Sequence, residues 1–175
     1  MYLNEILNGI DFTLTGKFEN VNINNIIYDS RKAAHDLLFV CIKGFKSDGH
    51  TYAKEVYDKG VRVFAASEVL DLPEDALIIH VEDTRKFLAL ASANYFGHPA
   101  KKLNTIAITG TKGKTSISFM LKSIYEAAGH KVGVVGSTGI YIGDRFYDSA
   151  NSTPESYLLH KYYRKMLDNG CDTAI

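Results

Sequence analysis

The chain contains 175 residues, of which 46% are hydrophobic and 23% are charged. This is enough apolar material for one good core or two small ones, and it argues against a disordered chain. Lysine plus arginine balance aspartate plus glutamate at 20 each, so no global field draws the protein to nucleic acid or to an anionic membrane, and we expect small-molecule partners.

The two cysteines and the first residues indicate the expected compartment. Cys41 and Cys171 show neither Cys-x-x-Cys nor Cys/His spacing, so we expect core thiols and no disulfide framework or zinc site. The opening Met-Tyr-Leu-Asn-Glu-Ile lacks the basic and apolar regions of a signal peptide. No apolar run approaches the roughly 18 residues of a membrane span. We therefore expect a cytoplasmic protein.

The first hundred residues alternate short apolar runs with helical periodicity. Strands are predicted at 26–28, 37–42, 61–65 and 77–81, and helices at 52–59 and from 84 to about 96. Thr84 is the predicted N-cap of the second helix. Gly97-His-Pro-Ala100 then interrupts the helical pattern. Residues 97–103 are therefore the predicted boundary between a domain at 1–100 and a second at 101–175.

The most informative segment runs from Ile106 to Ile117, with the sequence Ile-Ala-Ile-Thr-Gly-Thr-Lys-Gly-Lys-Thr-Ser-Ile. It predicts a buried strand, a glycine turn and a helix that begins near Lys114. Glycines let the backbone curl so that amide groups point inward, and the helix adds the positive end of its dipole. This arrangement binds the phosphates of ATP. Lys114 would reach the β- and γ-phosphates, and the hydroxyl of Thr115 would be a ligand of Mg²⁺.

The loop is shorter than the strict P-loop pattern. The first glycine of that pattern would fall on Ile108, and the glycine of this loop is Gly110. The alternative is a glycine-rich turn that only closes a helix onto a sheet. Gly-Lys-Thr directly after an apolar strand favours the phosphate loop.

The remainder of the chain predicts the start of a parallel sheet with flanking helices. Predicted here are a helix from 114 to about 128, a strand at 131–136, a hairpin at 141–147, a helix from about 154 to 167, and a strand beginning at 171–175. Thr153 is the predicted N-cap of the second helix, with Pro154 at its first position. Such a small sheet would leave much apolar surface exposed, so residues 101–175 are predicted to be the first part of a larger ATPase domain.

Three separated segments together resemble the Mur ligases. They are Asp29-Ser-Arg31 with the following 36–44, then Ser47-Asp-Gly-His50, and finally Thr109-Gly-Thr-Lys-Gly-Lys-Thr115. These ATP-dependent ligases extend UDP-N-acetylmuramoyl peptides during peptidoglycan synthesis. The resemblance covers nearly the whole chain. It implies an α/β fold: a small N-terminal α/β domain that binds the UDP-sugar, followed by the start of a P-loop-type central ATPase domain with a parallel sheet.

Within the family, Asn151-Ser-Thr-Pro-Glu-Ser156 is most similar to the members that add a diamino acid, L-lysine or meso-diaminopimelate, to UDP-N-acetylmuramoyl-L-alanyl-D-glutamate. The resemblance implies an acyl-phosphate intermediate and a fragment that is inactive by itself. We also expect a monomer with no nucleic-acid or membrane partner. The rival is the ligase that adds D-Ala-D-Ala, which typically begins its loop Gly-Ser and lacks Thr-Pro-Glu-Ser. Folylpolyglutamate synthases share the ATPase fold but lack such a preceding domain.

The resemblance also implies roles for individual residues. For the UDP-sugar these are Tyr28, Ser30, Arg31, Phe45, Lys46 and Ser47; for the peptide and the transferred phosphate, Asn151, Ser152 and Thr153; for ATP, Gly110, Thr111, Lys112, Gly113, Lys114, Thr115 and Ser116. Lys114 and Thr115 are the catalytic candidates.

Several of these residues keep alternative interpretations. Arg31 would either contact phosphate or brace the loop through Asp29, and Thr153 could be a plain helix cap. Lys112 stands where the family commonly has asparagine or histidine, and Ser152 replaces a threonine. Two alternatives of another class stay open for the whole chain. One is a module that only binds a nucleotide or UDP-sugar, and the other is a P-loop kinase, which leaves the Asp-Ser-Arg domain unexplained.

Overall fold

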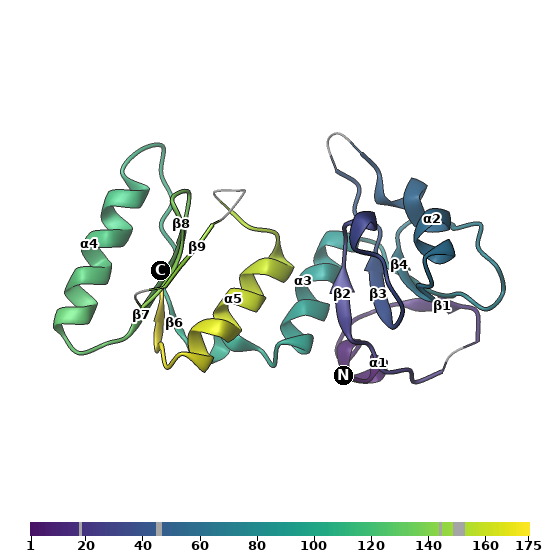
Figure 1. The fold of residues 1–175 in the computed structure, drawn as a ribbon, viewed down its shortest axis with the longest axis horizontal. Helices are drawn as coiled ribbons and strands as arrows, with labels where there is room; N and C mark the ends of the chain where they lie inside the picture. The colour runs from purple at the N-terminus through teal and green to yellow at the C-terminus, as the bar shows by residue number, and fades with distance from the viewer. Residues whose placement is uncertain (18, 45–46, 144, 149–152) are drawn as a thin grey trace. The chain divides into compact units, whose positions relative to one another are not determined.

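A computed structural model describes residues 1–17, 19–44, 47–143, 145–148 and 153–175. The chain divides into two compact units, Met1–Tyr95 and Phe96–Ile175. Each is built around a five-stranded sheet (Figure 1).

The first unit holds a sheet in the order β1-β5-β4-β3-β2. Its elements are α1 (Leu3–Ile6), β1 (Thr13–Thr15), β2 (Asn25–Ile27), η1 (Ser30–Lys32), β3 (Leu37–Val40), η2 (Gly49–Tyr52), α2 (Ala53–Asp58), β4 (Val63–Ala66), β5 (Leu77–His80) and α3 (Thr84–Tyr95). All neighbouring strands are parallel except β1, which pairs antiparallel with β5. The strands and helices predicted for this unit are confirmed to within a few residues at each end.

Strands β3 and β4 are buried along their whole length, as expected for a parallel sheet that is covered on both faces. Phe39 and Phe64 lie on one face with Val56 of α2, and their rings meet edge to face at 6.2 Å. Cys41 belongs to the same core. Its side chain is fully buried, which confirms the prediction of a core thiol, and this burial raises the pKa of the thiol to about 12.

The second unit holds a sheet in the order β6-β10-β7-β8-β9. Its elements are η3 (Pro99–Lys102), β6 (Asn104–Thr105), α4 (Lys114–Ala127), β7 (Val132–Gly136), β8 (Gly139–Ile142), β9 (Arg145–Tyr147), α5 (Ser156–Asp168) and β10 (Thr173–Ala174). Strand β10 is parallel to both β6 and β7, and β7, β8 and β9 are antiparallel. Figure 1 shows α4 and α5 on opposite sides of this sheet. Cys171 is buried in the core beneath α5.

The prediction of a buried strand directly before the phosphate loop is wrong. Strand β6 is only Asn104–Thr105, both exposed, and Ala107 is also exposed. The Ile106 amide still donates to the carbonyl of Ala174, which is the last residue of the β10 strand. Within the described residues no strand lies opposite 107–109, so their backbone groups lack the ladder partners that define a strand.

Two predicted helix caps are also wrong. Asp83, and not Thr84, accepts the amides of Arg85 and Lys86 at the start of α3. Helix α5 begins at Ser156 and not after Thr153, because the residue before it, Glu155, is extended with ψ 151°. A cap contributes only about 1 kcal/mol, which tertiary packing readily outweighs.

Candidate active site

The turn between β6 and α4 has the curled backbone that a phosphate loop needs. Gly110 has φ 152° and Gly113 has φ 82°, and the second value is in the left-handed region that favours glycine. Gly113 is the N-cap residue of α4 and carries no side chain that could bond the first amides of the helix. Those amides, at the positive end of the helix, are therefore free to bind an anion.

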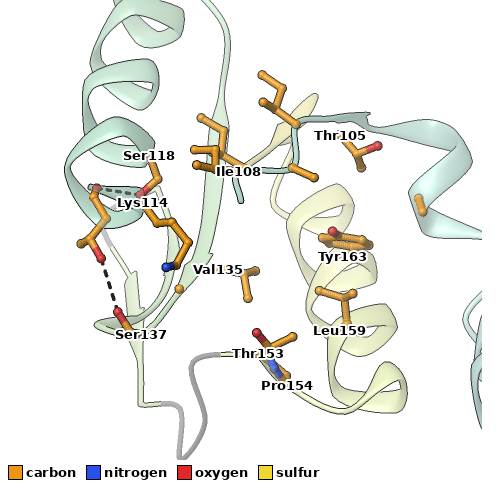
Figure 2. Close-up of a pocket in the computed structure, with 16 residues that line it drawn as sticks. Thr105, Ile108, Lys114, Ser118, Val135, Ser137, Thr153, Pro154, Leu159 and Tyr163 are labelled. Atoms are coloured by element: carbon orange, nitrogen blue, oxygen red, sulfur yellow. Dashed lines mark hydrogen bonds between the residues drawn. The ribbon is translucent and has the colours of Figure 1, made fainter. Parts of the chain in front are cut away.

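Lys114 and Thr115 begin α4 and lie beside the end of β7. The ammonium of Lys114 donates a hydrogen bond to the carbonyl of Gly110, so the side chain folds back over the loop. The Thr115 and Ser137 hydroxyl oxygens lie 3.3 Å apart, and the Ser118 hydroxyl donates to the Thr115 carbonyl at 2.8 Å (Figure 2). Three hydroxyl groups and one cation thus gather at the carboxyl edge of the sheet.

These side chains line a cavity of about 480 Å³ within the second unit. Figure 2 shows Lys114 and Ser137 across the cavity from Leu159 and Tyr163 of α5, with Thr153 near its rim. The cavity therefore has one wall of an ammonium and hydroxyl groups and another of apolar side chains. A polar ligand with an apolar part suits such a cavity.

The cavity brings together three of the predicted site residues: Lys114, Thr115 and Thr153. The remaining predicted loop residues are exposed and do not line it: Gly110, Thr111, Lys112, Gly113 and Ser116. Sequence reasoning missed Ser118 and Ser137. Ser137 follows a buried strand directly, and this position at a carboxyl edge is a signal that could have identified it. Four predicted residues lie outside the described residues: Phe45, Lys46, Asn151 and Ser152.

In the first unit, Tyr28 and Ser30 follow the carboxyl end of β2, and both are half-buried. The side chain of Asp29 accepts the amide of Arg31 and caps η1. The Arg31 guanidinium also donates to both oxygens of Asp29, each at 2.8 Å. Two roles were expected for Arg31, and the structure shows the one in which Arg31 braces the loop through Asp29. The Lys59 ammonium donates to the Ser30 carbonyl and attaches this turn to α2.

The ion pair with Arg31 gives a testable pH dependence. The side-chain hydrogen bond from Arg31 lowers the pKa of Asp29 from 3.8 to about 2. Because the folded-state pKa is depressed, the stabilisation is present above about pH 4 and is lost as the pH falls toward 2. We expect NMR titration of the carboxyl carbon to give a midpoint near 2, and Arg31→Gln to raise it toward 3.8. Arg62→Gln, which breaks the pair with Asp75, is the control. A wild-type midpoint near 3.8 would contradict the prediction.

A second cluster of polar side chains lies after the ends of β3 and β4, at the same carboxyl edge of this sheet. Asp48 caps η2 by accepting the amide of His50, and it also contacts the His50 ring. These bonds lower the pKa of the Asp48 carboxyl. Lys43 and Ser67 line a cavity of about 510 Å³ with the start of α3, and the predicted substrate residue Ser47 is exposed directly before Asp48.

Two family models match the chain. The model of the Mur ligase family catalytic domain covers residues 22–96, and that of the Mur ligase middle domain covers residues 108–175. The first lies within the first compact unit except for its last residue, Phe96, and the second lies within the second unit.

Curated relatives match over 90% or more of the chain. A UDP-N-acetylmuramoyl-L-alanyl-D-glutamate--2,6-diaminopimelate ligase of Clostridium perfringens is 43% identical over 100% of this chain and 36% of its own length. The protein of the same name from Clostridium botulinum is 44% identical over 100% and 37%, and that of Bacillus licheniformis is 41% identical over 90% and 32%. The chain thus spans about a third of the length of these relatives.

Solved structures share the fold. A structure of a UDP-N-acetylmuramoyl-L-alanyl-D-glutamate--2,6-diaminopimelate ligase matches 99% of this chain and 35% of its own with a TM-score of 0.79 at 20% identity. A ligase of Thermotoga maritima, solved in complex with ADP, matches 90% and 32% with a TM-score of 0.55 at 18% identity. Among the described residues, no helix is both long and apolar enough to cross a bilayer.

Proposed function

Since this chain belongs to the Mur ligase family, we propose that it is part of an ATP-dependent ligase that adds a diamino acid to UDP-N-acetylmuramoyl-L-alanyl-D-glutamate. The observation that carries the proposal is the glycine loop that presents Lys114 and the open N-terminus of α4 beside a cavity. The names of the curated relatives support diaminopimelate as the diamino acid, with L-lysine as the alternative. A solved structure of a ligase that adds D-Ala-D-Ala matches at 21% identity, which supports a shared fold and not the rival reaction.

We assign the two units different tasks. Residues 1–100 would hold the UDP-sugar, through Tyr28, Ser30 and Arg31 and through the wall formed by Phe45, Lys46 and Ser47. Residues 101–175 would begin the ATP-binding domain, with the loop from Gly110 to Ser116 around the phosphates. Thr153, with Asn151 and Ser152, would lie near the transferred phosphate.

The residues in and around the glycine loop fit a nucleoside triphosphate. Positive-φ glycines let backbone amides converge, and a helix end without a side-chain cap supplies further donors. The Lys114 ammonium is a cation at the mouth of the loop, and the paired hydroxyls of Thr115 and Ser137 are hard oxygen ligands of the kind that Mg²⁺ prefers. When bound there, Mg²⁺ would neutralise charge on the phosphate oxygens.

Amide formation from a carboxylate requires activation, because the carboxylate oxygen is a poor leaving group. In the proposed reaction a D-glutamate carboxylate oxygen attacks the γ-phosphorus of ATP, and the bond to ADP breaks. The amine then attacks the carbonyl of the acyl phosphate, inorganic phosphate leaves, and the amine loses a proton. Lys114 and the loop amides stabilise the charge that spreads over the phosphoryl oxygens. We also propose a cytoplasmic monomer with no nucleic-acid or membrane partner.

Calorimetric titration of the folded chain with UDP-N-acetylmuramoyl-L-alanyl-D-glutamate tests the proposal, with UDP-N-acetylglucosamine and ATP as comparisons. We expect selective binding of the muramoyl dipeptide. If this chain does not bind it, the same titration of the full-length protein distinguishes a pocket that needs further domains from a wrong assignment. Absence of binding by the full-length protein would reject the proposed substrate.

A further inference from the structure

The turn that follows β3 holds a buried histidine within a polar network. The His50 side chain is only 6% exposed, and its Nδ1 lies 2.6 Å from Oδ1 of Asp48. The amide of Ser67, the first residue after β4, donates to Nε2 of His50 at 3.2 Å. Lys43 pairs with Glu68 at 3.0 Å and lies 3.9 Å from Asp48. His50 therefore connects a turn after β3 to the end of β4.

The hydrogen bonds define the state of the ring. Nε2 accepts a bond from a backbone amide, so it carries no proton, and Nδ1 donates its proton to Asp48. Asp48, His50 and Glu68 are close enough to hold a metal ion. However, the Nε2 lone pair already accepts the Ser67 amide, Nδ1 faces Asp48, and the Lys43 ammonium pairs with Glu68 and lies near Asp48. The network is therefore a hydrogen-bonded brace and not a metal site.

The backbone around the network is closely constrained. The Gly44 amide donates to the Ser47 carbonyl at 2.9 Å, and the Gly49 amide donates to the Ile42 carbonyl at 2.9 Å. A Cβ atom at Gly49 would lie 2.7 Å from the Ile42 nitrogen, closer than side chains allow. The turn is thus packed against the end of β3, and a shift of Asp48 would also move Ser47, its neighbour in the chain.

We propose that His50 is a positioning residue for the nucleoside diphosphate sugar. It holds Asp48 against the end of β4, and Asp48 in turn holds Ser47 at the carboxyl edge where the UDP-sugar is proposed to bind. This inference rests on the proposed function of the first unit. His50 does not touch the reacting groups, so its loss should weaken binding of the UDP-sugar and leave the use of ATP unchanged.

The test compares His50→Phe with wild type in the full-length protein. Phenylalanine fills the ring volume and removes both hydrogen bonds. We expect the KM for UDP-N-acetylmuramoyl-L-alanyl-D-glutamate to rise roughly tenfold, from the loss of the two hydrogen bonds that the His50 ring makes to Asp48 and Ser67. The expected kcat and KM for ATP stay within about twofold of wild type, since neither depends on this turn. His130→Phe, which breaks a similar bond to Asp172 in the other unit, is the matched control and should leave all three constants unchanged.

Two further variants keep the proposal testable if His50→Phe does not fold. His50→Asn can still donate to Asp48, and His50→Gln can still accept from Ser67, so each should give an intermediate KM for the UDP-sugar. An unchanged KM in the folded variants would overturn the role of His50. A kcat and a KM for ATP that worsen as much as the KM for the UDP-sugar would also overturn it, because His50 would then only support the folded structure. Wild-type protein that does not turn over the muramoyl dipeptide would instead reject the proposed function, and this inference with it.

Discussion

Lys114→Ala is expected to abolish ligation while leaving the affinity for the UDP-sugar intact. The Lys114 ammonium lies at the start of α4 and folds back over the phosphate loop. Loss of one preorganised charge donor to a phosphoryl group typically lowers kcat roughly a hundredfold to a thousandfold. The UDP-sugar is proposed to bind the first unit, which has its own sheet and core. Its affinity should therefore stay within about twofold of wild type.

Two measurements on the full-length protein check this prediction. Phosphate release in the presence of all substrates reports ligation, and calorimetric titration with UDP-N-acetylmuramoyl-L-alanyl-D-glutamate reports the first unit. Lys122→Ala is the control: Lys122 belongs to the same helix but pairs with Glu126 one turn later. It should keep wild-type turnover. Full turnover by Lys114→Ala would reject the proposed role of the loop.

Gly113→Val is expected to weaken ATP binding through backbone conformation alone. Gly113 has φ 82°, and a Cβ atom there would meet nothing closer than 3.9 Å. The side chain therefore has room, but a left-handed conformation costs a residue with a Cβ about 1–2 kcal/mol, and a β-branched residue more. Because the valine variant can adopt the shape that binds phosphate only at that energetic cost, its affinity for ATP should fall roughly thirtyfold.

Gly129→Val separates this effect from general strain. Gly129 follows the other end of α4 with φ 90°, and no atom lies within 4 Å of a Cβ there. The substitution should lower the free energy of unfolding by about 1–2 kcal/mol. ATP affinity should stay at the wild-type value, because this end of the helix faces no phosphate. Titration with ATP and thermal unfolding of both variants measure the two effects, and equal ATP affinity in both variants would refute the argument.

Features that depend on nearby residues were predictable. The apolar runs of β3, β4 and β5 identify buried strands, and the spacing of apolar residues identifies α2 and α3. Gly110 and Gly113 indicate a curled loop because glycine alone adopts such φ values at low cost. The family resemblance also rests on short local motifs, and the family models confirm it.

Helix starts were less predictable, because competing local choices differ by little energy. Asp83 and Thr84 are both good N-cap residues, and the structure uses Asp83. Thr153 and Pro154 would have opened α5 in isolation, yet Pro154 is buried against the cavity and the helix begins two residues later. Differences of about 1 kcal/mol are decided by packing.

By itself, the sequence determined the family, most of the buried strands, the helices α2 to α5, and the loop that presents Lys114, because each depends on residues close together in the chain. The tertiary structure alone decided that β10 lies between β6 and β7, that Ser137 joins Thr115 at the cavity, and that His50 bonds to Ser67. These pairings join residues that are distant in the chain. Their energy depends on the packed sheet as a whole, which no local pattern of residues encodes.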